Sequence, residues 1–198
     1  WSSDVCSSDL SPARRGNWRK CAPTRKPNAT KCGDVILYTL SDRSELSSIT
    51  RPSLERYAKR FGHTLVVINE TLCGSDRHAS WSKLKLLNST PDGMSCMWVD
   101  DDIILTNIQT DVWANYAATL HSASLVVSED FRPSIFNMGM VIAVGGEKLR
   151  SVCQKIWDIG SRSPFYRFGG WWEQSAAQEL FVSEPGLFQI VPFREIQA

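Results

Sequence analysis

The most informative stretch of this chain is Met97-Trp98-Val99-Asp100-Asp101-Asp102-Ile103-Ile104-Leu105. A short apolar run delivers three consecutive carboxylates, and a second apolar run follows at once. Burying adjacent unpaired carboxylates is very costly, so such a cluster normally lies at a strand end and holds a cation. On an extended backbone Asp100 and Asp102 point to one side and Asp101 to the other. Oxygen ligands without a neighbouring His or Cys favour Mg²⁺ or Mn²⁺ over zinc. A surface turn with three solvated acids is the alternative.

The composition is that of an ordinary globular chain whose size suits one domain. Its 198 residues are 42% hydrophobic and 22% charged, and the formal net charge is +1. This balance gives no bulk argument for binding nucleic acid or an anionic membrane. The longest apolar stretch, near residues 138–144, is far too short to span a bilayer.

The beginning of the chain carries separate expectations. Residues 2–10, SSDVCSSDL, match a translated sequencing-library adapter, so we treat residues 1–10 as an artefact. Residues 11–32 are basic and contain prolines, which predicts a lead-in without ordered structure. A nucleic-acid-binding arm is the alternative, but Trp18 is the one aromatic residue there that stacking would use. The globular domain is expected over residues 33–198.

Alternating apolar runs predict strands that are followed by helices. The predicted strands cover residues 34–40, 63–69, 96–99, 123–127, 136–144 and 186–191. The predicted helices cover residues 52–61, 80–87, 110–120, 147–159 and 171–181. Pro52 suits the first turn of its helix, and Ser80 suits a helix cap. This alternation implies an α/β fold with a mainly parallel sheet, in which ligands bind beyond the carboxyl ends of the strands.

Four parts of the chain, in this order, resemble nucleotide-sugar glycosyltransferases of the GT-A fold. They are DVILYTLSD (34–42), RHASWSKLKLL (77–87), MWVDDDIILTN (97–107), and FNMGMVIAV (136–144) followed by WWEQSAAQEL (171–180). The likeness is greatest to the α-galactosyl- and α-xylosyltransferase family, and glycogenin-like enzymes are more distant. It covers the chain from about Gly33 onward. It implies a Rossmann-like three-layer α/β/α domain with a mainly parallel central sheet.

The resemblance implies a metal-dependent site for a UDP- or GDP-sugar donor. Asp100 and Asp102 would hold Mn²⁺ or Mg²⁺, which as a Lewis acid stabilises the departing nucleoside diphosphate. The implied donor-binding residues are Thr39, Ser41, Asp42, Arg43, Lys83, Asp100, Asp101 and Asn137. For Lys83 the alternative is a solvated surface lysine, and for Asn137 it is a buried turn amide.

The resemblance places catalytic and acceptor-binding groups near the start of the last helix. Gln174 is the first candidate for the side chain beneath the anomeric carbon of a retaining enzyme, and Glu173 is the second. Polar groups that complement the helix dipole are the alternative. Trp171 and Trp172 offer a flat apolar surface on which sugar rings stack. Asp130 either takes an acceptor hydroxyl or pairs with Arg132.

One departure from the family concerns the metal. GT-A enzymes usually add a third ligand, often a His, near the end of the domain, whereas no His follows His121 here. We therefore expect a domain that is truncated at its C-terminus. A membrane anchor is not visible in such a fragment, and the location stays open: the Golgi lumen for a eukaryotic protein, the cytoplasm for a bacterial or viral one.

The resemblance thus implies a glycosyltransferase that moves a hexosyl or pentosyl group to the hydroxyl of a glycan acceptor, with retention. One alternative is a truncated or degenerate domain that binds nucleotide sugar or carbohydrate without turnover. The other is an Asp-nucleophile phosphatase, which normally carries its D-x-D motif on the first strand with Thr or Val next. Here the motif follows the third predicted strand, and Ile103 comes after it.

Overall fold

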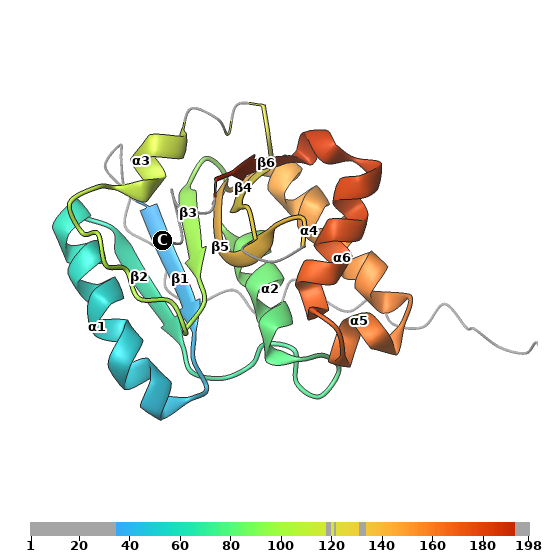
Figure 1. The fold of residues 1–198 in the computed structure, drawn as a ribbon, viewed down its shortest axis with the longest axis horizontal. Helices are drawn as coiled ribbons and strands as arrows, with labels where there is room; N and C mark the ends of the chain where they lie inside the picture. The colour runs from blue at the N-terminus through green and yellow to red at the C-terminus, as the bar shows by residue number, and fades with distance from the viewer. Residues whose placement is uncertain (1–34, 118–119, 121, 131–133, 193–198) are drawn as a thin grey trace, which may run out of the picture.

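The computed structural model describes residues 35–117, 120, 122–130 and 134–192. The segments predicted to be an adapter artefact (1–10) and a basic lead-in (11–32) lie outside these residues, as does Arg132. Over the described part of the chain, six strands form one sheet in the order β2-β1-β3-β5-β4-β6, and helices cover both of its faces (Figure 1).

The predicted strands are all present, with ends that agree within two residues. They are β1 (Val35–Leu40), β2 (Thr64–Ile68), β3 (Ser95–Val99), β4 (Leu125–Ser128), β5 (Asn137–Val144) and β6 (Phe188–Val191). The α-helices are α1 (Ser44–Phe61), α2 (Ser82–Ser89), α3 (Val112–Tyr116), α4 (Glu147–Ser161), α5 (Pro164–Phe168) and α6 (Trp172–Ser183). Two 3₁₀ turns, η2 (Ala79–Trp81) and η4 (Pro185–Leu187), precede α2 and β6. No helix of the described residues is long and apolar enough to cross a bilayer.

The sheet is parallel except for one strand. β1 pairs in parallel with β2 and β3, and β4 pairs in parallel with β6. β5 lies between β3 and β4 and runs antiparallel to both. The carboxyl ends of the five other strands therefore share one edge of the sheet with the amino end of β5. We call this edge the carboxyl edge.

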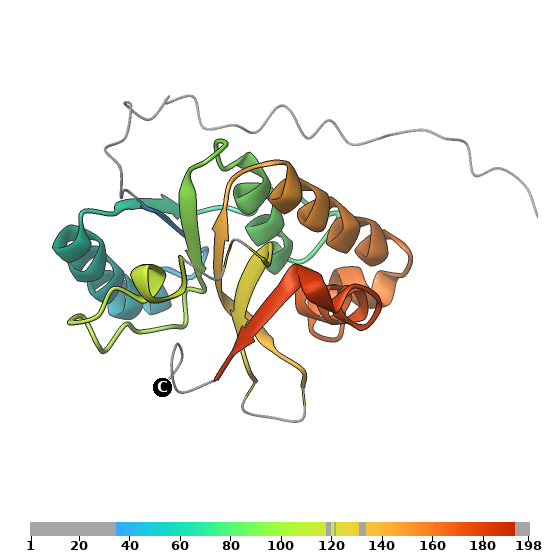
Figure 2. The ribbon, with the colours of Figure 1, turned by 90° about the horizontal axis from the view of Figure 1, so that it is seen from above.

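The core consists of two apolar layers, one on each side of the sheet. Leu37 and Met97 point to the side of α1 and α3, where they pack with Tyr57. Tyr38 and Trp98 alternate to the other side, where α2, α4 and α6 supply the partners. Figure 2 shows the sheet between these two sets of helices. The predicted three-layer α/β/α class is confirmed.

The predicted start of the first helix at Pro52 is wrong. α1 begins at Ser44, and Pro52 lies inside it. Proline removes one helical hydrogen bond and frees the carbonyl of the residue four positions earlier. That residue, Ser48, is exposed like Pro52, so water can satisfy its carbonyl, while Thr50 and Leu54 stay buried on the core side.

Candidate functional site

The carboxyl edge brings together chain segments that are far apart in the sequence. The loop after β1 contributes Ser41 to Arg43, and the end of β3 contributes Asp100 to Asp102. Because β5 is antiparallel, its first residue, Asn137, lies at the same edge, beside the last residue of β4, Ser128. The start of α6 completes the group with Glu173 and Gln174.

Asp101 links the end of β3 to the loop after β1. Its side chain is buried, and it accepts a hydrogen bond from Ser41 Oγ at 2.9 Å. The Arg43 guanidinium pairs with both Asp101 carboxylate oxygens, and its Nε lies 3.2 Å from Oδ2. This hydrogen bond raises the pKa of Arg43, although Arg43 itself is largely exposed. Three predicted donor-binding residues therefore form one cluster.

Asp100 points away from that cluster and toward β5 and α2. Its backbone N–H donates to Gly139 O at 2.8 Å, and Trp98 Nε1–H donates to its Oδ1 at 2.5 Å. Lys83 Nζ lies 3.2 Å from the same oxygen. Desolvation raises the pKa of Asp100 to about 6, and the negative charge of Glu173 adds to this, although Lys83 and Trp98 act in the opposite direction.

Lys83 is a buried cation, so its interpretation as a solvated surface lysine is wrong. Only 1% of the side chain is exposed. Its ammonium donates to Met138 O at 2.6 Å and to Glu173 Oε1 at 2.8 Å. Burial by itself would lower the pKa of Lys83, but the charges of Asp100 and Glu173 outweigh it and the pKa is raised. A protonated lysine thus joins two carboxylates from different elements.

The first turn of α6 faces β5 with two buried polar side chains. Gln174 Oε1 accepts the backbone N–H of Met138 at 2.9 Å. Because a backbone N–H is only a donor, the amide nitrogen of Gln174 must face the other way. This nitrogen and Glu173 Oε2 are buried and have no hydrogen-bond partner in the protein. Buried polar atoms are normally satisfied, so these two atoms suit water or a polar ligand.

Gly139 keeps the space beside Asp100 open. A Cβ at Gly139 would lie 2.7 Å from Asn137 Oδ1, 3.2 Å from Ile103 Cδ1 and 3.4 Å from Asp100 Oδ2. The Asn137 Oδ1 atom also accepts the N–H of Gly139 at 2.5 Å. This hydrogen bond is local to β5, and it places the Asn137 amide next to the same glycine that Asp100 contacts.

The remaining predicted residues lie at the same edge but outside these contacts. Asp42 and Asp102 are exposed, and Asp130 is half-buried two residues after β4. Thr39 is buried near the end of β1, and its hydroxyl has no hydrogen-bond partner in the protein. Over the described residues, no group of three or more His, Cys, Asp or Glu side chains is arranged to hold a metal.

The two predicted stacking tryptophans separate in the structure. Trp171 is 56% exposed. Trp172 is half-buried and stacks on His78, with ring centroids 3.9 Å apart and an interplanar angle of 6°. Trp172 also has a φ of 48°, a left-handed conformation that costs a non-glycine residue about 1–2 kcal/mol. His78, rather than the predicted Ser80, caps the turn before α2, because His78 accepts the N–H of Ser80.

Helix α5 was not predicted, although the sequence carries a signal for it. Ser163 caps this helix by accepting the N–H of Phe165, and Pro164 occupies its first position. Ser-Pro is a recognisable helix start. None of the five residues of α5 is buried, so the helix lacks the apolar periodicity that makes a short helix visible in a sequence.

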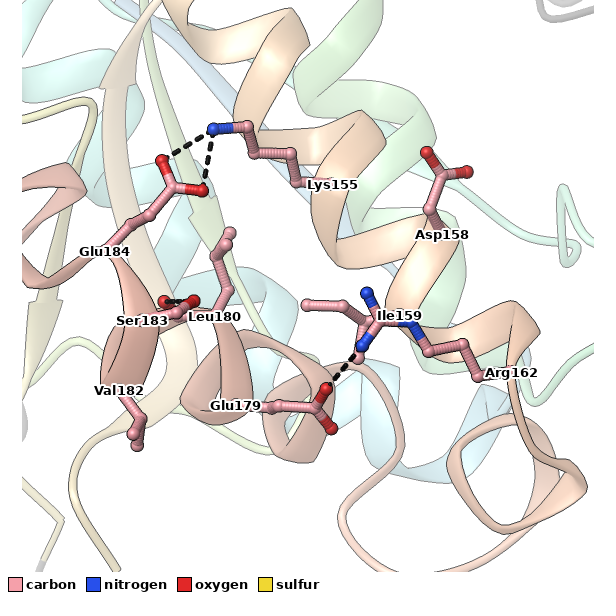
Figure 3. A pocket seen from close by; sticks show the side chains of 9 residues that line it. All are labelled: Lys155, Asp158, Ile159, Arg162, Glu179, Leu180, Val182, Ser183 and Glu184. Carbon is pink, nitrogen blue, oxygen red and sulfur yellow. Dashed lines mark hydrogen bonds and ion pairs between the residues drawn. The ribbon is translucent and has the colours of Figure 1, made fainter.

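A pocket of about 640 Å³ lies elsewhere, between α4 and the second half of α6 (Figure 3). Two ion pairs cross its rim: Lys155 with Glu184 at 2.6 Å, and Arg162 with Glu179 at 2.7 Å. Ile159 and Leu180 contribute apolar lining. None of the predicted site residues lines this pocket, so it is distinct from the carboxyl-edge cluster.

Comparisons with known proteins bear on the fold. No protein-family model and no characterised protein sequence matches the chain. A glycosyltransferase involved in the glycosylation of the major capsid of PBCV-1 has a similar structure, with a TM-score of 0.63 and 14% identity over 80% of this chain and 82% of that chain. The apo form of mouse xyloside xylosyltransferase 1 gives a TM-score of 0.52 and 10% identity over 81% and 86%. At such identities the likeness shows the fold alone, so this chain has the GT-A architecture.

Proposed function

We propose that this chain is a glycosyltransferase that takes a sugar from a nucleoside-diphosphate sugar and attaches it to a glycan hydroxyl. The observation that carries this proposal is the cluster of Asp100, Lys83 and Glu173 beside Gly139. It lies at the edge where ligands bind in open α/β sheets. The fold shared with two glycosyltransferases supports the same function.

The carboxylates at the end of β3 fit a divalent cation such as Mn²⁺ or Mg²⁺. Carboxylate oxygens are hard donors, and Mg²⁺ is commonly held by one or two carboxylates together with substrate phosphates. Asp100 has an oxygen facing Gly139, and Asp102 is exposed. Two protein ligands therefore suffice when a diphosphate supplies the others. When bound, the cation offsets the charge that the departing diphosphate acquires.

The donor nucleotide would lie against the loop after β1. Asp101, Ser41 and Arg43 hold this loop to the end of β3 through contacts of 2.9 and 3.2 Å. The hydroxyl of Thr39 and the carboxylate of Asp42 are the further polar groups that we assign to donor binding. Asn137, at the start of β5 beside Gly139, is assigned to the donor sugar.

Glu173 and Gln174 are the groups that we assign to the reacting centre. Glu173 Oε2 is the free acceptor atom, and the Gln174 amide nitrogen is the free donor atom. A carboxylate oxygen stabilises the positive charge that develops at the anomeric carbon. In retaining enzymes a side chain lies beneath the anomeric carbon of the donor sugar. We assign this role to Gln174 or Glu173, so we expect retention of configuration. Asp130 remains the candidate for orienting the acceptor hydroxyl.

A binding and turnover experiment tests the proposal. Isothermal titration with a panel of UDP- and GDP-sugars, with and without Mn²⁺, should reveal at least one donor whose affinity depends on the metal. Asp100→Asn should lose this binding. Asp92→Asn is the matched control, because Asp92 is exposed in the turn before β3 at the opposite edge and pairs with Arg150.

The same samples separate catalysis from binding alone. Release of UDP or GDP in the presence of glycan acceptors is expected for a transferase. Metal-dependent donor binding without nucleotide release would indicate a binding domain. Absence of binding for every donor in the panel would contradict the proposal as a whole.

A further inference from the structure

Three large aromatic side chains are exposed next to the candidate site. Phe165, Phe168 and Trp171 are 58%, 55% and 56% exposed, and all of them come from one seven-residue stretch. Phe165 and Phe168 lie three positions apart on α5, so they share one side of this helix. Exposed aromatic side chains grouped in this way are often functional.

Packing places the Phe165 ring against the start of α6. A Cβ at Gly170 would lie 2.6 Å from Phe165 Cζ, so the Phe165 ring rests against the residue that precedes Trp171. Trp171 is two positions from Glu173. Trp172, which lies between Trp171 and Glu173, is held in place by its stack on His78. The hydrogen bond from His78 N–H to Arg167 O at 3.0 Å joins α5 to the turn before α2, the helix that carries Lys83. The aromatic patch, defined as Phe165, Phe168 and Trp171, therefore lies on the segment between this turn and Glu173.

Charge favours a neutral ligand for the aromatic patch. Arg162 and Arg167 are the cations nearest to the aromatic patch in the sequence, and both are in ion pairs: Arg162 with Glu179 at 2.7 Å and Arg167 with Asp76 at 3.6 Å. Binding to an anionic membrane surface relies on basic residues that are available for lipid headgroups. Planar aromatic rings flanked by neutralised charges instead suit the apolar C–H faces of uncharged sugar rings.

The size of the aromatic patch favours a small ligand over a protein. Three aromatic side chains, each with just over half of its surface exposed, offer roughly 300–400 Å² of apolar area. A stable protein–protein interface buries about 800 Å² on each partner. The available area instead matches two or three sugar rings laid side by side.

We propose that the aromatic patch is a stacking subsite for an oligosaccharide acceptor, and that it holds the sugar rings beyond the one that reacts. This proposal rests on the proposed function, because it places the reacting hydroxyl next to Glu173. It specifies the acceptor class as a neutral glycan of at least two or three rings. A monosaccharide would reach the reacting centre but would not contact Phe165 and Phe168 on α5.

Nuclear magnetic resonance titration without donor or metal tests the subsite. The probes are glucose, maltose and maltotriose; cellobiose and cellotriose; and xylose, xylobiose and xylotriose. The indole N–H signal of Trp171, identified with Trp171→Phe, reports on the aromatic patch. At least one series should shift this signal, with an affinity that rises about threefold to tenfold from one ring to three.

Two variants separate stacking from folding. Phe168→Ala should remove the gain from the longer sugar while leaving the circular dichroism spectrum unchanged. Phe165→Leu keeps apolar bulk against Gly170 and should still weaken trisaccharide binding, because it removes the flat ring. Val182→Ala is the control, since Val182 is 74% exposed at the far end of α6. Equal affinities for one and three rings in every series would overturn the subsite.

Two further outcomes would also overturn it. Phosphatidylcholine vesicles that shift the Trp171 signal when no oligosaccharide does would indicate a membrane contact. A shift that depends on protein concentration alone would indicate self-association. Metal-dependent donor binding that Asp100→Asn abolishes, together with no sugar effect at Trp171, would leave the proposed function intact and remove only the subsite.

Discussion

Lys83 Nζ lies 2.8 Å from Glu173 Oε1, although 90 positions of sequence separate the two residues. This contact ties α2 to the first turn of α6, and both side chains are almost fully buried. Asp100 joins the pair through the same ammonium at 3.2 Å. A single buried cation therefore sets the relative positions of the D-x-D strand and the helix that carries the candidate reacting groups.

Replacing this cation should destabilise the fold. Lys83→Met leaves the buried Glu173 without its counter-charge and removes the cation next to the half-buried Asp100, and breaking a buried ion pair from one side costs about 3–5 kcal/mol. Urea denaturation should show a loss of this size in the free energy of unfolding. Lys148→Met, at an exposed position on α4, is the matched control and should change it by less than about 0.5 kcal/mol. A loss of under 1 kcal/mol for Lys83→Met would show that the buried ion pair is not formed.

The contribution of Lys83 should decline at high pH. Its pKa is raised in the folded protein above the ordinary value of 10.5, so the folded state holds this proton more tightly than the unfolded state. The stabilisation is complete below pH 10.5 and is lost as the pH rises through the folded-state pKa. The difference in unfolding free energy between wild type and Lys83→Met should therefore shrink above pH 10.5. A difference that grows above this pH would reverse the assigned sign.

Gly139 should tolerate no side chain. The added Cβ of Gly139→Ala would crowd Asn137 Oδ1 at 2.7 Å and stand beside the carboxylate of Asp100. Overpacking of this kind costs about 1–3 kcal/mol, and we expect donor affinity to fall at least tenfold as well. Gly186→Ala is the control, because a Cβ there meets nothing within 4 Å. Thermal unfolding and donor titration check both effects, and unchanged donor affinity would place the donor elsewhere.

His78 should act through its stack on Trp172, as a positioning residue. His78→Ala removes the ring that supports Trp172 in its left-handed conformation, so the start of α6 and Glu173 should shift. We expect kcat for sugar transfer to fall about tenfold with a smaller change in KM for the donor. His78→Phe keeps a flat ring and should restore most of the rate. If His78→Phe is as impaired as His78→Ala, the imidazole nitrogens matter and the stack does not.

Much of the fold was predictable because the strands are continuous apolar runs. β1, β3 and β5 are buried on both faces, and such runs end where polar residues begin. The start of α1 was missed because its first turns are rich in serine and half-exposed. α5 was missed because it buries nothing, so no apolar face shows in its sequence.

The candidate site was predictable as a set of residues but not as a set of contacts. Strand alternation indicated that Asp101 points away from Asp100. It gave no means of finding the partners of Asp101, because Ser41 lies 60 positions away and meets it only through the pairing of β1 with β3. The burial of Lys83 likewise depends on α6, which arrives 90 positions later. Tertiary pairing, rather than local pattern, decides both.

Paramagnetic broadening by Mn²⁺ would locate the proposed cation at the end of β3. In the presence of UDP, low Mn²⁺ concentrations should selectively broaden the amide signals of Asp100, Asp102 and Gly139. The amide of Asp92, at the opposite edge of the sheet, should stay sharp, and Asp100→Asn should abolish the selective broadening. Uniform broadening, or broadening centred away from the end of β3, would show that Asp100 and Asp102 do not bind the cation.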